Sequence, residues 1–435
     1  MASKPTSMTI RAYDVGFGDC FLLSFDYASG TRHVLIDFGS TRNPSGKEGQ
    51  GNYLERIAAQ IKADCGGKLT AVVATHRHKD HISGFTNTGS KGPGAVIRAL
   101  KPEIVLQPWT EDPDAARDAK KPTKGLRGAR LRRNLMLRNL EDMNRFAGFA
   151  QQAASRLQGS HLARARAQLD FLGDDNDLAN RDAVVNLMTM GKRKPRYLFA
   201  GAPSGLESLL PGVKVHVLGP PTLEQDPRIK TQTDQQADEF WHLRSGFWAR
   251  RGALAKTKGA LSAPLFPRLI AGGSAPWDAR WFRYHAQIEQ AEALLSIVRT
   301  LDDAMNNTSL VLLFEIGDTC LLFPGDAQWE NWRYALGQAK YQKLLARVNV
   351  YKVGHHGSLN ATPKTLWKGF ANKGGAGSAH RLLSLLSTKD GVHGESEATA
   401  VPRSTLVKAL KENSTLIDTR DAKPSELSRR QVITL

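Results

Sequence analysis

The stretch His76-Arg77-His78-Lys79-Asp80-His81 places three imidazoles and a carboxylate within six residues. It follows an apolar, β-prone run over residues 69–75, which predicts a buried strand. Residues 82–85 predict a loop that turns into a helix. The cluster is therefore expected at the C-terminal end of a core strand, where α/β proteins place their chemistry.

The donor atoms of this stretch indicate a metal site. Alternate residues of an extended segment can converge on one point, so we expect His76 and His78 to share one metal position. Asp80 and His81 can then turn toward a second position nearby. Imidazole nitrogens and carboxylate oxygens are ligands of Zn(II), Mn(II) and Fe(II). The alternative is a polar loop that is rich in histidine but holds no ion.

The size and composition of the chain are those of a globular protein with an unusual charge. Its 435 residues can bury a large core, in one elaborated α/β domain or in two or three domains. Hydrophobic residues make up 41% and charged residues 23%, which is ordinary. The formal net charge of +18 favours polyanionic partners such as nucleic acid, phosphorylated metabolites or anionic membrane surfaces. Such a charge could also serve solubility alone.

Cysteine usage and the N-terminal residues indicate a cytoplasmic protein. Cys20, Cys65 and Cys320 are far apart and form no Cys-x-x-Cys motif, which is typical of a reducing compartment. A metal site in this chain would therefore use nitrogen and oxygen ligands. Residues 1–6 lack the apolar core of a signal peptide. No run approaches the roughly 20 apolar residues of a membrane span, so we expect no membrane partner.

Predicted strands and helices surround the histidine stretch. They are strands at 8–15, 20–27 and 32–37, helices at 53–65 and 95–100, and a strand at 103–109. This order is typical of an α/β or α+β sandwich. Asp37 ends a buried strand, where a carboxylate is costly unless it is paired. It could cap a helix or hold a metal-binding histidine, and we favour the second role.

Two long stretches interrupt the strand pattern. Residues from about 111 to 195 look helical and basic, which predicts an inserted lobe with one basic surface, although a merely solvated helix would look the same. Residues from about 222 to 305 are irregular and interleave tryptophans with Arg and Lys. They could stack on and neutralise a single nucleic-acid strand, or pack as a satellite of the core.

Acids and histidines recur at strand ends in the C-terminal half. Further strands are expected at 197–200, 213–218, 310–314, 320–323, 348–353, 381–386 and 431–435, with a helix at 405–410. Asp326 follows the strand at 320–323, and His355 and His356 follow the strand at 348–353. The strand at 310–314 is preceded by Asn306-Asn307-Thr308-Ser309.

Four motifs in this order resemble the metallo-β-lactamase superfamily: Leu35-Ile36-Asp37, His76-Arg77-His78-Lys79-Asp80-His81, Gly325-Asp326 and His355-His356-Gly357-Ser358. The local forms are similar to one branch, the soluble hydrolase domain of competence DNA-uptake (ComEC) proteins. The stretches that carry this second likeness are 14–19, 306–311, 325–327 and 352–358. The resemblance spans residues 8 to 410, with both insertions unmatched. It implies one four-layer αββα sandwich over residues 1–435 that carries the two insertions.

The resemblance also implies a set of metal ligands. They are His76 and His78 at a first metal, Asp80 and His81 at a second, and Asp326 as a bridge between the two. One of His355 and His356 would complete the second site, with His356 favoured because the superfamily usually ends this motif in Gly-His-Gly. The implied cofactors are one or two divalent ions, Zn(II) or Mn(II).

The chain departs from the superfamily in two places. The usual further histidine before the bridging aspartate is replaced by residues 306–309, as in the competence branch, and His216 looks like a sheet residue. The late Gly-His-Pro of that branch is replaced by Val401-Pro402. The first metal position therefore has three evident protein ligands.

The implied activity is metal-dependent cleavage of a phosphodiester in DNA or RNA. A bound divalent metal lowers the pKa of its water to about 7 and so supplies hydroxide. The catalytic candidates are Asp80 and Asp326, which would receive or orient the water proton, and His355 beside them. The substrate-binding candidates are Asn306, Ser309 and Ser358, as donors to a phosphate oxygen, and Lys352, which could lend charge or point to solvent.

Two other functions fit the sequence. The chain could hydrolyse a small anionic molecule, such as a cyclic nucleotide, a lactone or a thioester, with the insertions closing a pocket. It could also be a non-catalytic polyanion-binding protein with a degenerate metal site. Salt dependence separates a polynucleotide substrate from a small one, because only the polymer releases several counterions.

Overall fold

The structure is a computed structural model. It describes residues 4–87, 92–113, 181–227, 306–358, 362–378, 381–392, 400–423 and 425–435. Most of the two expected insertions, 111–195 and 222–305, lies outside these residues.

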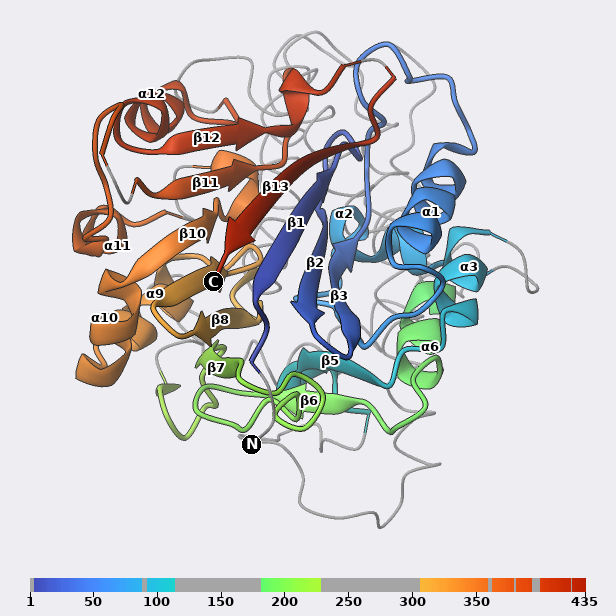
Figure 1. The fold of residues 1–435 in the computed structure, drawn as a ribbon, viewed down its shortest axis with the longest axis horizontal. Helices are drawn as coiled ribbons and strands as arrows, with labels where there is room; N and C mark the ends of the chain where they lie inside the picture. Colours follow the sequence, from blue (N-terminus) through green and yellow to red (C-terminus); the bar gives the residue numbers. More distant parts are fainter. Residues whose placement is uncertain are drawn as a thin grey trace, which may run out of the picture.

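Two mixed sheets form the centre of the molecule (Figure 1). The seven-stranded sheet has the order β13-β1-β2-β3-β4-β5-β6. Its strands are β1 Ser7–Tyr13, β2 Cys20–Tyr27, β3 Gly30–Phe38, β4 Ala71–Val73, β5 Ile104–Pro108, β6 Arg196–Leu198 and β13 Ser428–Thr434. The six-stranded sheet has the order β12-β11-β10-β9-β8-β7. Its strands are β7 Lys214–Gly219, β8 Val311–Ile316, β9 Thr319–Phe323, β10 Val348–Lys352, β11 Leu383–Leu386 and β12 Thr415–Asp418.

Each sheet is antiparallel in one half and parallel in the other. In the first sheet β3, β4, β5 and β6 run parallel to one another, and in the second β9, β10, β11 and β12 do. Parallel strands end at the same edge of their sheet, so the loops that follow them lie close together. The sheets and helices confirm the expectation of an α/β or α+β fold.

The core between the sheets comes from strict alternation of side chains. In β2, Phe21, Leu23 and Phe25 belong to the cluster between the two sheets, whereas Cys20 and Leu22 face the other side. Successive side chains of a strand point to opposite faces, so a strand buried on both faces is apolar throughout. The first four residues of β2, 20–23, are accordingly apolar on both faces and buried.

Helices cover the outer faces of both sheets (Figure 1). On the seven-stranded sheet they are α1 Tyr53–Asp64, α3 Pro93–Ala99 and α6 Arg181–Thr189. On the six-stranded sheet they are α9 Trp329–Leu336, α10 Ala339–Ala346, α11 Lys364–Gly369 and α12 Ser404–Asn413. Short turns of helix are α2 Lys79–Ile82, η1 Ser83–Phe85, η2 Trp109–Glu111, η7 His355–Gly357 and η8 Thr419–Asp421. Among the described residues, no helix combines the length and apolar character needed to cross a membrane.

The strand expected at 69–75 is shorter in the structure and joins the two sheets at its end. β4 ends at Val73, and the next residue, Ala74, donates its N–H to Leu106 in β5. The carbonyl of Thr75 then accepts from the N–H of Leu310, which leads into β8 of the other sheet. The histidine stretch therefore begins where the sheets are bonded to each other.

Gly39 lets α2 approach the end of β3, which gives a test of this packing. A Cβ on Gly39 would lie 2.5 Å from backbone atoms of Lys79, Asp80 and His81. We expect Gly39→Ala to lower the free energy of unfolding by about 1–3 kcal/mol, because the helix backbone must shift. Urea denaturation measures the effect. Gly49→Ala is the control, since no atom lies within 4 Å of its added Cβ; equal stability of both variants would contradict this account.

Candidate metal centre

The candidate centre lies where the parallel strands of both sheets end. Asp37 is the penultimate residue of β3, and the stretch 76–81 follows β4. From the other sheet, Asp326 follows β9 and His356 follows β10 in η7. Four segments that are distant in the sequence therefore meet at one edge of the sandwich.

The first group of donor atoms belongs to Asp80, His81, Asp326 and His356, which are all buried. His356 Nε2 lies 2.8 Å from Asp80 Oδ2 and 3.4 Å from Asp326 Oδ2. His81 Nε2 lies 3.0 Å from Asp326 Oδ2 and 3.8 Å from Asp80 Oδ2. Ligand atoms about 2.0–2.1 Å from a tetrahedral ion are about 3.3 Å apart. The four donors thus have the spacing and chemistry to hold one divalent ion.

The second group consists of His76, His78 and Asp80. His76 Nε2 lies 3.0 Å from His78 Nδ1, so two nitrogens face one point, as the alternation along the stretch predicted. The third member is Asp80, whereas Asp326 belongs to the first group. Asp80 is therefore the residue that the two groups share.

Asp37 holds His81 in a ligand orientation. Asp37 Oδ2 lies 2.8 Å from His81 Nδ1, so the Nδ1–H donates to the carboxylate and Nε2 is left to face the cluster. The carboxylate itself is fixed by Thr75, whose backbone N–H and hydroxyl both donate to it at 2.7 Å. This contact is the one that the expected role of Asp37 requires.

His356 is oriented in the same way by different atoms. Its Nδ1 lies 3.0 Å from the carbonyl oxygen of Ser387, which follows β11, so Nδ1 donates and Nε2 faces Asp80. The ring also packs on Phe17 at a centroid distance of 4.5 Å. A third strand end of the six-stranded sheet thus sets the tautomer of this histidine.

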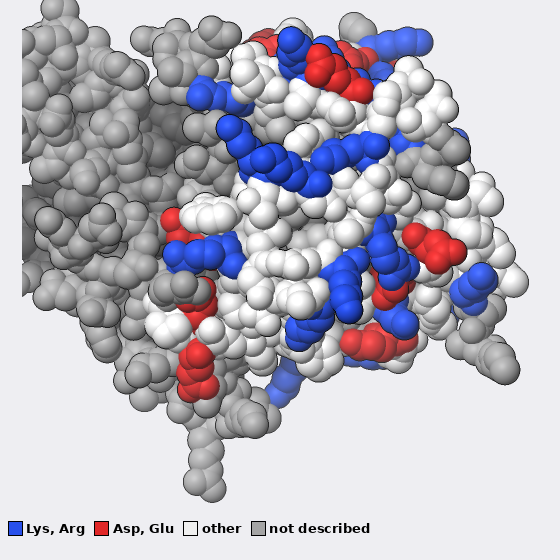
Figure 2. All heavy atoms as spheres, turned by 90° about the vertical axis from the view of Figure 1, so that its left-hand side faces the viewer, with Lys and Arg blue, Asp and Glu red and all other residues white. Residues whose placement is uncertain are grey.

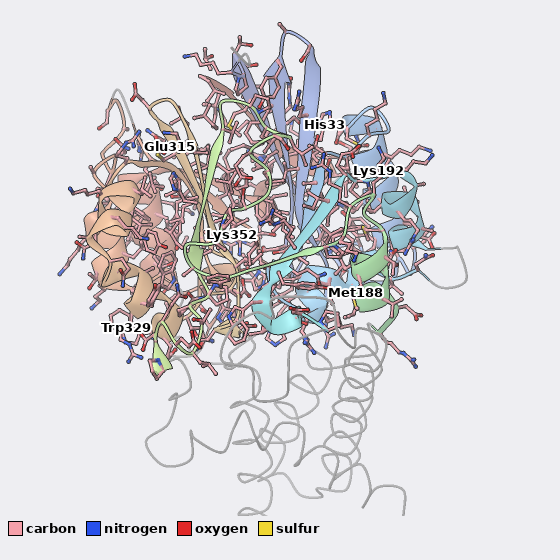
Figure 3. All side chains as sticks on the ribbon, turned by 90° about the horizontal axis from the view of Figure 1, so that it is seen from below. His33, Met188, Lys192, Glu315, Trp329 and Lys352 are labelled. Carbon is pink, nitrogen blue, oxygen red and sulfur yellow. The ribbon has the colours of Figure 1, made fainter. Side chains whose placement is uncertain are left out.

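Lys352 holds the far oxygen of Asp326. Lys352 is 2% exposed, and its Nζ lies 3.3 Å from Asp326 Oδ1, 3.2 Å from the Gly325 carbonyl and in close contact with Asp19 Oδ2. The backbone N–H of His355 donates to the same Oδ1 at 3.1 Å. Asp326 therefore turns only Oδ2 toward the histidines. Figure 3 shows Lys352 near the centre of the molecule and Trp329 at its margin.

A second buried ion pair anchors the residue between the two histidines. Arg77 Nε donates to Glu111 Oε1 at 2.9 Å, and its Nη2 contacts the other oxygen. Glu111 closes η2 after β5. Arg77 is thus tied to the neighbouring strand end while His76 and His78 share a point.

The carboxylates set the charge of the first group. Burial alone would lower the pKa of His356, but Asp326 and Asp19 raise it to about 10. Burial likewise opposes the charge of His81, but Asp326 and Asp80 raise its pKa well above the usual range. The carboxylates thus favour positive charge at the position between His81 Nε2 and His356 Nε2.

In the second group the histidine pKa values are lowered. Burial, with the neighbouring His81 and His78, lowers the pKa of His76 well below its usual range. Burial lowers the pKa of His78 to about 4, although Asp80 opposes the shift. Both imidazoles are therefore neutral near pH 7, which is the form that binds a metal.

The backbone at the centre is strained. Among the described residues, the non-glycine residues with positive φ are Asp37, His355, His356 and Lys101, at +54°, +43°, +51° and +52°. The first three belong to the candidate centre. Such conformations cost of order 1–3 kcal/mol each and cluster at functional sites.

The remaining sequence candidates take different positions. His355 lies outside the ligand groups, and its Nδ1 has no hydrogen-bond partner among the described residues. Ser309 Oγ accepts from the N–H of Asp326 at 3.2 Å, and Asn306 is buried. Ser358 is buried, with a hydroxyl that has no hydrogen-bond partner among the described residues. His216 pairs with Glu315 on β8, in keeping with a sheet residue.

Sequence reasoning did not find the role of Asp19. This residue precedes β2 and lies beside Lys352 and 3.7 Å from His81 Nδ1. The signal was present, since Asp19 is an acid at the start of an apolar strand, where a carboxylate needs a partner. Its partner is 333 residues later in the chain, so the pairing is visible only in three dimensions.

Comparison of the chain with models of known protein families finds no match, and a search among curated proteins finds none either. The resemblance to the metallo-β-lactamase superfamily therefore stays a prediction from the motifs.

The contact between Asp37 and His81 can be tested by metal affinity. Asp37→Asn replaces an oxygen that accepts from His81 Nδ1–H by a group that is less basic and can face it with N–H. We expect Zn(II) or Mn(II) to bind about 10–100-fold more weakly, as for other residues that orient a metal-binding histidine. Isothermal titration calorimetry measures this. Asp26→Asn, which alters bonds only to Ser7 and Thr31, should bind the metal like the wild type. Unchanged affinity in Asp37→Asn would contradict the role.

Removing the buried lysine should destabilise the protein. Lys352→Met leaves Asp19 and Asp326 buried without their shared cation. We expect the free energy of unfolding in urea with EDTA to fall by about 3–5 kcal/mol. Lys62→Met, on the exposed side of α1, should change it by less than about 0.5 kcal/mol. A Lys352 variant as stable as the wild type would show that the contacts of Lys352 with Asp19 and Asp326 do not stabilise the centre.

Proposed function

We propose that the chain is a metal-dependent hydrolase of the metallo-β-lactamase superfamily that cleaves phosphodiester bonds in DNA or RNA. The observation that carries the proposal is the buried group Asp80, His81, Asp326 and His356, assembled from both sheets. These are the residues that the superfamily motifs name, in the motif order. Chance assembly of four ligand-type side chains with tetrahedral spacing is a poor alternative, because buried acids and imidazoles are costly.

The arrangement of layers supports the four-layer αββα sandwich that the proposal requires. One apolar cluster lies between the sheets, and one further cluster lies between each sheet and its helices. The three free cysteines, all buried, agree with action in the cytoplasm. The net charge of +18 agrees with a nucleic-acid substrate.

The residues of the centre have distinct tasks in this proposal. A divalent ion held there, Zn(II) or Mn(II), would lower the pKa of a water and supply hydroxide near neutral pH. In this proposal Asp80, which both donor groups share, receives the water proton. Asp326 keeps one fixed orientation, because Lys352 and the His355 N–H hold its Oδ1.

Two atoms beside the centre are suited to the substrate. His355 Nδ1 and the Ser358 hydroxyl are buried polar atoms that have no hydrogen-bond partner among the described residues. A buried polar atom without a partner costs about 1–3 kcal/mol, which a substrate oxygen would relieve. We assign proton transfer to the leaving oxygen to His355 Nδ1, and a hydrogen bond to a phosphate oxygen to Ser358.

Cleavage assays test this function. We expect the purified protein with Mn(II) or Zn(II) to cleave labelled single- or double-stranded DNA or RNA, and EDTA to stop the reaction. Asp326→Ala and His356→Ala should lower the rate by at least about 100-fold, since each removes a donor to the ion that would activate the water. His216→Ala is the control, because this histidine pairs with Glu315 away from the centre.

Two outcomes would contradict the proposal. The first is an absence of cleavage with every substrate and metal, at a protein concentration where metal is bound. The second is cleavage that Asp326→Ala leaves undiminished, which would trace the activity to another site or a contaminant. Hydrolysis of cyclic nucleotides, lactones or thioesters without cleavage of polymers would favour the small-molecule alternative.

A further inference from the structure

A long segment around the metal loop carries no acidic residue. The chain holds 42 Asp and Glu, yet none occurs between Asn331 and Lys389. The same segment holds ten Lys and Arg residues. It contains α10, α11, β10 and the loop with His355 and His356. The segment therefore contributes positive charge that no acidic residue of its own offsets.

Much of this charge lies on one outer face. Figure 1 shows α12, α11 and α10 one below the other along the six-stranded sheet, and we call their solvent side the α10–α12 face. Its exposed lysines are Lys340, Lys343, Lys364, Lys368, Lys408 and Lys411. The single acid on these three helices is Glu412, which lies 4.0 Å from Lys408. Figure 2 looks onto this side and shows several clusters of Lys and Arg side chains, with Asp and Glu side chains among them.

The described residues do not neutralise most of this charge. Lys340, Lys343, Lys364 and Lys368 form no ion pair with another described residue, and all four are exposed. Arg347, which follows α10, pairs with Glu315 and is therefore not one of the cations without an ion pair. Lysines without an ion pair among the described residues, on two helices in contact, repel one another, which favours the binding of an anion to these helices.

The face is continuous with the metal loop. Lys364 begins α11 eight residues after His356. α12 starts directly after Arg403, whose backbone N–H donates to the carbonyl of Gly357 at 2.9 Å. The start of α12 therefore adjoins the loop that carries His355 and His356.

We propose that the α10–α12 face binds the phosphate backbone of a long polynucleotide whose scissile bond lies at the metal centre. The inference rests on the proposed function and names the surface that holds the polymer. Lysines at successive helices match a chain of phosphates better than they match one small anion. An anionic membrane fits less well, because surface-binding helices insert apolar side chains. The exposed large hydrophobic residues of the described chain are Trp329 and Val432, and neither lies on α10–α12.

A charge-reversal variant tests the surface. The surface variant combines Lys340→Glu, Lys343→Glu, Lys364→Glu and Lys368→Glu. The control variant combines Lys62→Glu, Lys68→Glu, Lys101→Glu and Lys194→Glu, which are exposed lysines on the α1, α3 and α6 side. Both variants have the same net charge, so a difference between them reports position. Thermal unfolding of each confirms that it is folded.

Binding is measured in EDTA, where cleavage is blocked, with fluorescein-labelled 30-residue single- and double-stranded oligonucleotides over a range of salt. Each phosphate contact contributes about 0.9 to the slope of log affinity against log salt for duplex DNA. We expect the slope of log affinity against log salt to be shallower by about 3–4 in the surface variant than in the control variant. We also expect the surface variant to bind at least about tenfold more weakly than the control variant. Hydrolysis of bis(p-nitrophenyl) phosphate, which is too small to span the face, should be equal in the two variants.

The outcomes separate this inference from the proposed function. Equal polynucleotide affinity and slope in the two variants would overturn the surface even if the wild type cleaves DNA or RNA. Loss of binding in the surface variant would support it even if no substrate is ever cleaved, and only the proposed function would then fall. Binding to phosphatidylserine vesicles without binding to polynucleotides would overturn it in favour of a membrane.

Discussion

The burial of negative charge is the constraint on which the rest of the structure depends. Asp19, Asp37, Asp80 and Asp326 are buried within one small region, and the buried Lys352 lies beside Asp19 and Asp326. Carboxylates in a low dielectric are unstable unless cations and hydrogen bonds compensate them. Imidazolium can supply that compensation, and a divalent ion can supply it with the same donor atoms. The fold is therefore arranged to hold positive charge at this point.

This constraint links the two sheets. Each sheet supplies part of the donor set from the loops after its parallel strands, and neither could form the group alone. Asp80 and His81 are held by Gly39 and Asp37 from the first sheet, whereas Ser387 orients His356 from the second. Metal binding of this kind is coupled to folding, because the donors come together only in the native state. The strained backbone at the centre is maintained by the same packing.

The candidate centre and the α10–α12 face differ in the charge of their side chains. Inside, acids gather cations, while outside, the segment from Asn331 to Lys389 presents lysines and no acid. An acidic side chain near the metal loop would repel a phosphate backbone, whereas an acid inside the centre is screened from it by the cations it binds. The two proposals are therefore complementary: one describes where a phosphodiester would react and the other where its polymer would be held.

Local sequence determined most of the strands, the helices α1, α3 and α12, and the ligand-type residues, because apolar periodicity and donor chemistry are properties of short segments. For that reason the sequence predicted donor residues from His76 to His81 and a buried, paired carboxylate at Asp37. β12, α9, α10 and α11 were not predicted, since short segments whose burial depends on distant partners carry weak local signals. Only the tertiary structure decided that Lys352 serves Asp19 and Asp326, and that His356 rather than His355 joins the ligand group. Those pairings depend on contacts across the two sheets, which no local pattern in the chain records.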